Sequence, residues 1–163
     1  MERSRRDLEL RSMERSRRMT QARTALERVT HYFHYSKEAT YEETLKRLDE
    51  IRPMLEPLPD RTPDALDLLG QISELRGRFD EAEAFWQEAV RLDDAFGTAH
   101  YHLGRLLLLK WFLADLEAPS YGFRHLAEQA EKHFQSAMAH MTGIEEELQR
   151  DVARAATALI RKN

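Results

Sequence analysis

The stretch that decides the fold is LGQISELRGRFDEAEAFWQEAVRLDDAF, residues 69–96. Together with Leu66 just before it, it follows the pattern L-x2-L-G and then, after a second glycine, A-x3-W-x2-A. Gly77 ends the first amphipathic segment, and the acids of RFDEAEAF open the second, where they suit the positive end of a helix dipole. The stretch therefore predicts two helices joined by a tight turn. The residues that define the pattern are Leu66, Leu69, Gly70, Gly77, Ala82, Trp86 and Ala89.

The same pattern occurs a second time. Leu103 and Gly104 lie 34 residues after Leu69 and Gly70, and residues 130–137 restate A-x3-F-x2-A through Ala130, Phe134 and Ala137. This composite resembles the tetratricopeptide repeat, a helix-turn-helix unit of that period. The resemblance covers residues 63 to about 142, with Ser73 in place of the usual aromatic residue and Asp94 in place of the usual proline. The glycines suit close helix contacts, and the large aromatic residues fill the remaining space.

The predicted fold is all-α, a right-handed α-solenoid of such repeats with about seven helices. A basic arm, residues 1–18, precedes one helical domain at 19–163, made of a degenerate repeat (19–60), a repeat (63–96), a repeat with an insertion (97–142) and a capping helix (144–162). Apolar residues at helical spacing support the flanking helices. They are Met19, Ala22, Leu26, Val29 and Phe33; Leu45, Leu48, Ile51 and Leu55; and Ile144, Leu148, Val152, Ala155 and Leu159, the face expected to cover the last repeat.

The second repeat carries about 14 extra residues. Gly70 and Ala82 are 12 residues apart, whereas Gly104 and Ala130 are 26 apart. The addition falls around KWFLADLEAPSYGF, residues 110–123, and we expect the preceding helix to continue through about Ala114. Either this apolar helix is enclosed by the solenoid, or Trp111, Phe112 and Leu116 form an exposed patch that a partner covers.

Composition excludes several classes of protein. The chain has no cysteine, which removes disulfides and thiolate chemistry, and no apolar run of membrane-spanning length. The arginine-rich N-terminus lacks the apolar core of a signal peptide, so a cytoplasmic protein is expected. Residues 1–30 hold nine arginines against five acids, although the whole chain has a net charge of −4.

The sequence contains no motif of a catalytic site. It has no nucleophile elbow, zinc-protease helix or phosphate-binding loop, and His31 and His34 lack a third ligand at a suitable spacing. We therefore expect no enzyme activity, no metal and no cofactor.

A protein or peptide partner is the favoured ligand. The resemblance implies that the first helices of the repeats line an inner groove that binds extended or helical peptides. The predicted partner-binding residues are Asp67, Gln71, Glu74, Tyr101, Arg105 and Leu108 in the groove, and Trp111 and Phe112 in the insertion. Such a protein would act as a scaffold, an adaptor or a small chaperone, and the sequence leaves open whether it forms homo- or hetero-oligomers.

The alternative function is binding of nucleic acid or another acidic surface through the basic arm. It is disfavoured because the body of the chain is acidic and no aromatic residues interleave the arginines of the arm.

Overall fold

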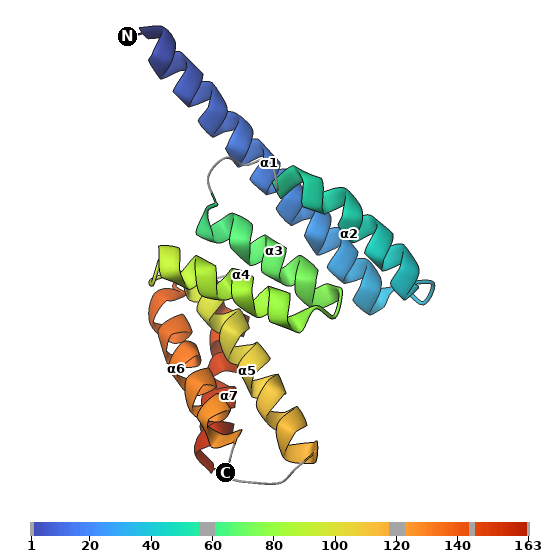
Figure 1. Cartoon of the computed structure of the whole chain (residues 1–163), viewed down its shortest axis with the longest axis vertical. Helices are drawn as coiled ribbons and strands as arrows, with labels where there is room; N and C mark the ends of the chain where they lie inside the picture. The colour runs from blue at the N-terminus through green and yellow to red at the C-terminus, as the bar shows by residue number, and fades with distance from the viewer. Residues whose placement is uncertain (1, 56–60, 118–122, 144–145, 163) are drawn as a thin grey trace.

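The computed structural model of the chain describes residues 2–55, 61–117, 123–143 and 146–162, and within these ranges it contains helices and no strand (Figure 1). The predicted all-α fold is confirmed. The helices are α1 (Glu2–Tyr35), α2 (Tyr41–Leu55), α3 (Pro63–Leu75), α4 (Phe79–Leu92), α5 (Gly97–Glu117), α6 (Arg124–His140) and α7 (Glu147–Lys162).

The helices form three successive hairpins and a final single helix. α1 packs against α2, α3 against α4 and α5 against α6, and α7 then packs against α6 and α5. The first helices of successive hairpins also touch, since α1 contacts α3, α3 contacts α5 and α5 contacts α7. Figure 1 shows the hairpins stacked along the long axis of the molecule, with the two termini at opposite ends. This arrangement is the predicted helical-repeat solenoid.

Residues 62–79 show how local chemistry builds one hairpin. The Thr62 side chain accepts a hydrogen bond from the backbone N–H of Ala65 at 3.3 Å, and Pro63 occupies the first turn of α3, where its missing N–H costs nothing. At the other end Gly77 adopts a φ of 72°, the left-handed conformation that glycine reaches without strain. The backbone N–H of Arg78 then bonds to the carbonyl of Ser73 at 2.9 Å and closes the helix end.

The repeat pattern describes packing between paired helices. Trp86 and Phe134 are almost completely buried, and each ring lies directly on a glycine of the partner helix. A β-carbon added to Gly104 would lie 2.8 Å from Phe134 Cδ1, and one added to Gly70 would lie 2.6 Å from Trp86 Cε2. The predicted close approach at both glycines is confirmed.

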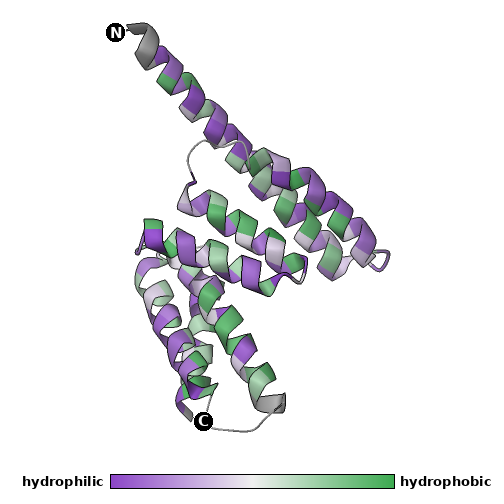
Figure 2. Cartoon of the chain, in the orientation of Figure 1, coloured by the Kyte–Doolittle hydropathy of each residue, from purple (hydrophilic) through white to green (hydrophobic). Residues whose placement is uncertain are grey.

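The apolar core consists of three clusters of buried residues that follow one another along the stack. The first joins α1, α2 and α3, the second joins α3, α4 and α5, and the third joins α5, α6 and α7. Figure 2 shows the hydrophobic residues interleaved with hydrophilic ones along the helices, as expected for helices with one buried face. The predicted apolar spacing of α1 and α2 is largely confirmed, because Ala22, Leu26, Val29, Leu48, Ile51 and Leu55 are all buried.

The N-terminal part of α1 projects beyond its partner α2 (Figure 1). α1 runs without interruption through residue 18, so the basic arm and the first helix of the body are one helix. Nearly all side chains from Arg6 to Arg18 are exposed, and Arg18 forms an ion pair with Glu14 one turn earlier.

The prediction for the apolar face of α7 is wrong. Leu148, Val152 and Leu159 are exposed, and Ile144 lies outside the described residues. The face that packs on the last hairpin instead contains Ala153, Ala156, Thr157 and Ile160. Small side chains line this contact because they let α7 approach closely, and the larger apolar residues lie to one side of it.

One helix end differs from expectation, because α5 continues to Glu117, three residues beyond the predicted end. α2 includes Pro53 in its last turn. In the described part of the chain no helix is both long enough and apolar enough to cross a lipid bilayer.

Candidate binding groove

The structure contains a groove of about 640 Å³ that connects the first helices of the hairpins. α1 forms one wall, α3 forms the floor, and the beginnings of α5 and α7 close the far side. The lining residues are Arg23, Leu26, Glu27, Thr30, His31 and Tyr35 from α1; Asp64, Asp67, Leu68 and Gln71 from α3; Phe96 and Thr98 at the start of α5; and Glu146 and Gln149 near the start of α7.

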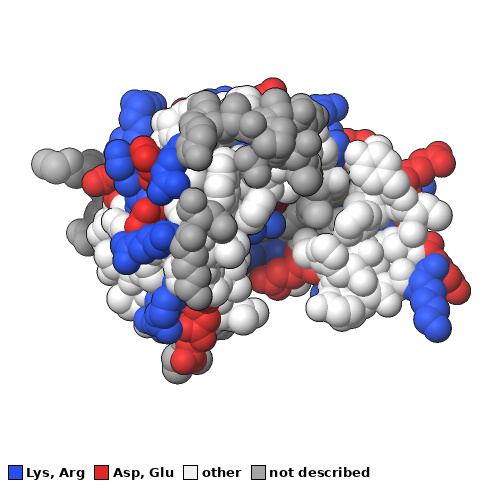
Figure 3. Space-filling view, turned by 90° about the horizontal axis from the view of Figure 1, so that it is seen from below, with Lys and Arg blue, Asp and Glu red and all other residues white. Residues whose placement is uncertain are grey.

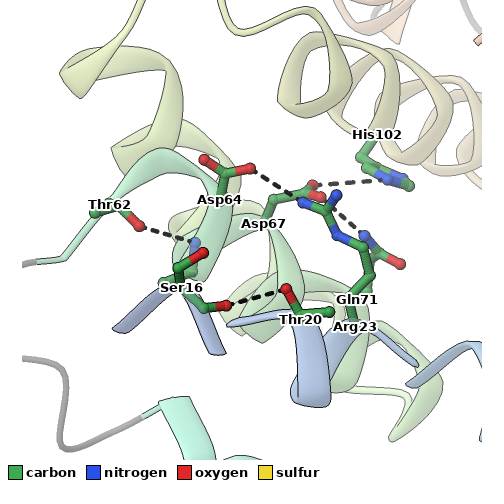
Figure 4. Close-up of polar contacts among 9 residues, drawn as sticks. Ser16, Thr20, Arg23, Thr62, Asp64, Asp67, Gln71 and His102 are labelled. Carbon is green, nitrogen blue, oxygen red and sulfur yellow. Dashed lines mark hydrogen bonds and ion pairs between the residues drawn. The ribbon is translucent and has the colours of Figure 1, made fainter. Parts of the chain in front are cut away.

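Polar contacts between α1 and α3 fix the edge of the groove. Arg23 of α1 donates a hydrogen bond from Nη2 to Asp64 Oδ1 at 3.1 Å, which ties the two helices together (Figure 4). Two turns further along α1, the rings of His31 and Tyr35 lie 4.9 Å apart between centroids, with their planes tilted by 38°, and give the groove an aromatic rim. Acidic residues outnumber basic ones in the lining, with four carboxylates against the single guanidinium of Arg23.

Asp67 lies at the floor of the groove, but its carboxyl group is buried. Its Oδ2 accepts a hydrogen bond from Gln71 Nε2 at 2.9 Å, and its Oδ1 lies 3.6 Å from His102 Nε2 on α5 (Figure 4). Burial raises the pKa of Asp67 to about 7, although the hydrogen bond from Gln71 opposes the shift. The carboxyl group therefore holds its proton into the neutral pH range.

His102 is the second member of this buried pair. Its ring stacks on Trp86 with centroids 4.9 Å apart and planes 10° apart, so it belongs to the core between α3, α4 and α5. Burial lowers the pKa of His102 to about 3, and the positive charge of Arg105 adds to the shift. Between about pH 3 and about pH 7 the pair is therefore neutral, with the proton on Asp67.

The predicted groove residues divide into two groups. Asp67 and Gln71 line the groove, whereas Glu74 and Arg105 form an ion pair that bridges α3 and α5 beyond its end. Tyr101 is buried beside Phe134 at 6.5 Å between ring centroids, and burial raises the pKa of its hydroxyl group. Tyr101 thus belongs to the core cluster of α5, α6 and α7.

The C-terminal part of α5 has one packed side and one exposed side. Leu108 and Trp111 are half-buried against the core of α5, α6 and α7. Phe112 is 41% exposed and Leu113 is 50% exposed, and Leu109 lies one turn before them on the same side. Trp111 is therefore packed against the core, and Phe112 is on the surface. Leu116 lies among the residues whose side chains are not described.

Figure 3 views the molecule from the end where α5 and α7 finish. Charged side chains of both signs lie around this face, with uncharged surface between them. Where its residues are described, this face mixes both signs of charge, whereas a polyanion is attracted by a patch of positive charge alone.

Sequence reasoning missed the contribution of α1 and α7 to the groove. Glu27 and His31 are exposed on α1, Thr30 is half-buried beside its buried apolar face, and Glu146 and Gln149 come from the opposite end of the chain. The cluster HYFHY at residues 31–35 was the available signal, because aromatic and histidine side chains are concentrated there on a surface helix.

Histidine burial was also missed. His100 Nδ1 lies 2.9 Å from His133 Nδ1, and His100 Nε2 lies 3.0 Å from the backbone carbonyl oxygen of Asp94. Burial, and then His100, lower the pKa of His133 to about 4, so His133 is neutral at pH 7 where it contacts α5 from α6. Among the residues that the structure describes, no three His, Asp or Glu side chains are grouped so that they could hold a metal ion.

Comparison with known proteins agrees with this architecture. The family model of the tetratricopeptide repeat matches residues 63–96, the hairpin of α3 and α4. The searches of curated proteins and of solved structures gave no match. Repeats of this family generally mediate interactions between proteins. The chain therefore contains a tetratricopeptide repeat, recognised at residues 63–96.

Proposed function

We propose that the protein binds a partner polypeptide in the groove between α1, α3 and the beginnings of α5 and α7. The groove itself is the observation that supports this proposal, because its volume of about 640 Å³ admits several side chains of a peptide. It lies along α3, the first helix of the recognised repeat. The protein would then act as a scaffold, an adaptor or a small chaperone, as its resemblance implies.

The lining favours a partner segment that carries lysine or arginine. Glu27 is exposed at the wall, and Glu146 lies opposite near the start of α7. Arg23, the basic residue of the lining, is already paired with Asp64. A cationic side chain of the partner would gain charge-assisted hydrogen bonds there, and Thr30, Gln71 and Gln149 offer hydrogen bonds to its backbone.

A suitable test changes the groove without changing the core. Glu27 is exposed and Gln149 is half-buried, so the double variant Glu27→Lys with Gln149→Lys reverses the local charge at little cost to folding. A matched control makes the same change in charge on α6, through Glu128→Lys with Gln135→Lys, which are both exposed. Tyr101 and Asp67 are unsuitable because they are buried.

Affinity purification from the source organism, followed by mass spectrometry, is the measurement. We expect the wild-type chain and the α6 control to retain the same partner, and the groove variant to lose it. Equal capture by all three chains would refute the groove as the binding site. Circular dichroism confirms that both variants remain folded.

The exposed side of α5 is a second contact surface for the same function. Phe112 and Leu113 form an apolar surface next to the half-buried Trp111, whose ring lies 5.0 Å from that of Phe112. Exposed aromatic residues of this kind contribute strongly to binding when a partner covers them. Phe112→Asp should weaken partner capture and leave the melting temperature unchanged; unchanged capture would exclude this surface.

A further inference from the structure

The last helix of the solenoid presents an apolar face to solvent. Leu148 is 75% exposed and Val152 is 41% exposed, and Ala155 and Leu159 continue the same stripe. These residues are spaced by four, three and four positions, so they lie on one side of α7. The stripe lies beside the narrower face of small residues through which α7 contacts the rest of the protein.

The repeat register explains why this stripe exists. Trp86 stands 18 residues before Gly104, and Phe134 stands 18 residues before Val152. Val152 therefore occupies the repeat position of Gly70 and Gly104, the glycines against which the second helix of each hairpin packs. At the positions equivalent to Leu148, Val152 and Ala155, α3 and α5 have buried residues throughout: Leu66, Gly70 and Ser73, and His100, Gly104 and Leu107.

α7 is thus built as the first helix of a hairpin, and no second helix covers it in the described part of the chain. The residue type at 152 limits what can cover it. Glycine at 70 and 104 admits the large rings of Trp86 and Phe134, whereas the side chain of Val152 fills that space. The covering helix must therefore place a small residue opposite Val152.

We propose that this stripe pairs with the same stripe of a second copy of the chain, with the two α7 helices antiparallel. In a two-fold symmetric pair Val152 of one chain faces Ala155 of the other, and Leu148 faces Leu159. Each large side chain then meets a compatible partner, and the contact is self-complementary, as a closed dimer requires.

The charges of α7 select the antiparallel direction. Asp151 and Arg154 stand on either side of the middle of the stripe, which falls between Val152 and Ala155. Antiparallel pairing about that middle brings Asp151 of each copy toward Arg154 of the other, whereas parallel pairing would oppose like charges. Asp151 and Arg154 are both exposed and pair with each other within the helix at 2.9 Å, so they can exchange partners when two copies meet.

Sedimentation of the purified full chain tests the association. The interface is a single pair of helices, so we expect weak, concentration-dependent dimerisation, measured between about 5 µM and about 1 mM. The average mass should rise from the monomer value of 19.2 kDa toward twice that value. Leu148→Glu should raise the dissociation constant roughly tenfold or more. The control Leu92→Glu, at a leucine of α4 that is 45% exposed, should leave it unchanged.

Charge exchange on α7 tests the direction. Asp151→Arg alone and Arg154→Asp alone should each weaken association, because each sets like charges against each other across the antiparallel contact. The double variant Asp151→Arg with Arg154→Asp should associate as the wild type does. A chain that stays at its monomer mass over the whole concentration range, or that associates equally well with Leu148→Glu, would overturn the proposal. The measurement needs no partner protein, so its outcome is independent of the groove.

Discussion

Replacing either member of the buried Asp67–His102 pair should make the free energy of unfolding depend on pH. In the natural pair the two pKa shifts have opposite signs, so their effects on stability cancel. In the folded protein Asp67 has a pKa of about 7 and His102 a pKa of about 3, whereas the ordinary values are 3.8 and 6.5. Between about pH 4 and 6.5 the pair holds one proton in both states, on Asp67 when folded and on His102 when unfolded. Because the proton count is equal, the pair adds no pH dependence in this range.

Asp67→Asn leaves His102 alone in its buried site. The folded pKa of His102 is below its unfolded value, so the unfolded chain takes up a proton below pH 6.5 and the folded chain does not. The stability of this variant relative to wild type should therefore fall as the pH falls, by about 1.4 kcal/mol per pH unit at most.

His102→Gln gives the opposite sign. The folded pKa of Asp67 is above its unfolded value, so the folded chain keeps a proton that the unfolded chain releases. Relative to wild type, the stability of this variant should rise by up to about 1.4 kcal/mol per unit as the pH falls from 7 toward 4.

Urea unfolding followed by circular dichroism measures these differences. Between about pH 6 and about pH 4.5 the two single variants should diverge by about 4 kcal/mol in relative free energy of unfolding, since each contributes about 2 kcal/mol of opposite sign. The double variant should run parallel to wild type. Single variants whose curves both follow that of wild type would refute the assignment of a buried neutral pair. Each substitution also lowers the free energy of unfolding by an amount that does not depend on pH. This loss shifts the plot of stability against pH without changing its slope.

Two further predictions concern the repeat and the arm. Gly104→Ala should lower the free energy of unfolding by about 1–3 kcal/mol, because its β-carbon would overlap the Phe134 ring. Adding Phe134→Leu to the same chain should reduce the loss caused by Gly104→Ala. If urea unfolding shows that the two losses simply add, the predicted contact is wrong. Deleting residues 1–18 should leave the melting temperature nearly unchanged, because almost all of the described side chains before Met19 are exposed. The same deletion should leave any nucleic-acid affinity and its salt dependence unchanged; a loss of both would support the alternative function of the basic arm.

The fold was predictable because the repeat spacing encodes packing directly. Gly70, Trp86 and their equivalents Gly104 and Phe134 are contacts between two helices close in sequence, and such contacts fix both the period and the hairpin. The family match at residues 63–96 falls on the hairpin where this pattern is most complete.

The groove was less predictable because it depends on how successive hairpins curve. Asp67 and Gln71 were expected in it and do line it, but the α1 wall and the α7 edge are brought there by stacking over the whole chain. Asp67 and His102 are polar residues of the inner helices, and they are buried against each other, with Gln71 bonded to Asp67 and His102 stacked on Trp86. The spacing of residues in the sequence does not show that Asp67 and His102 are in contact.

The exposed stripe of α7 was misassigned for a related reason. The apolar residues of α7 cover more of the helix circumference than one helix contact needs. Their spacing alone does not show that the alanines, and not most of the larger residues, line the actual contact.

The groove is tested most directly by photo-crosslinking at single positions in the source organism. A photoreactive amino acid placed at Thr30, on the α1 wall, should form a covalent adduct with a partner polypeptide, and the same amino acid at Gln135, exposed on α6, should not. The adduct at position 30 should disappear when Glu27→Lys and Gln149→Lys are introduced into the same chain. A partner that crosslinks from Gln135 and not from Thr30, or an adduct at position 30 that survives both substitutions, would contradict binding in this groove.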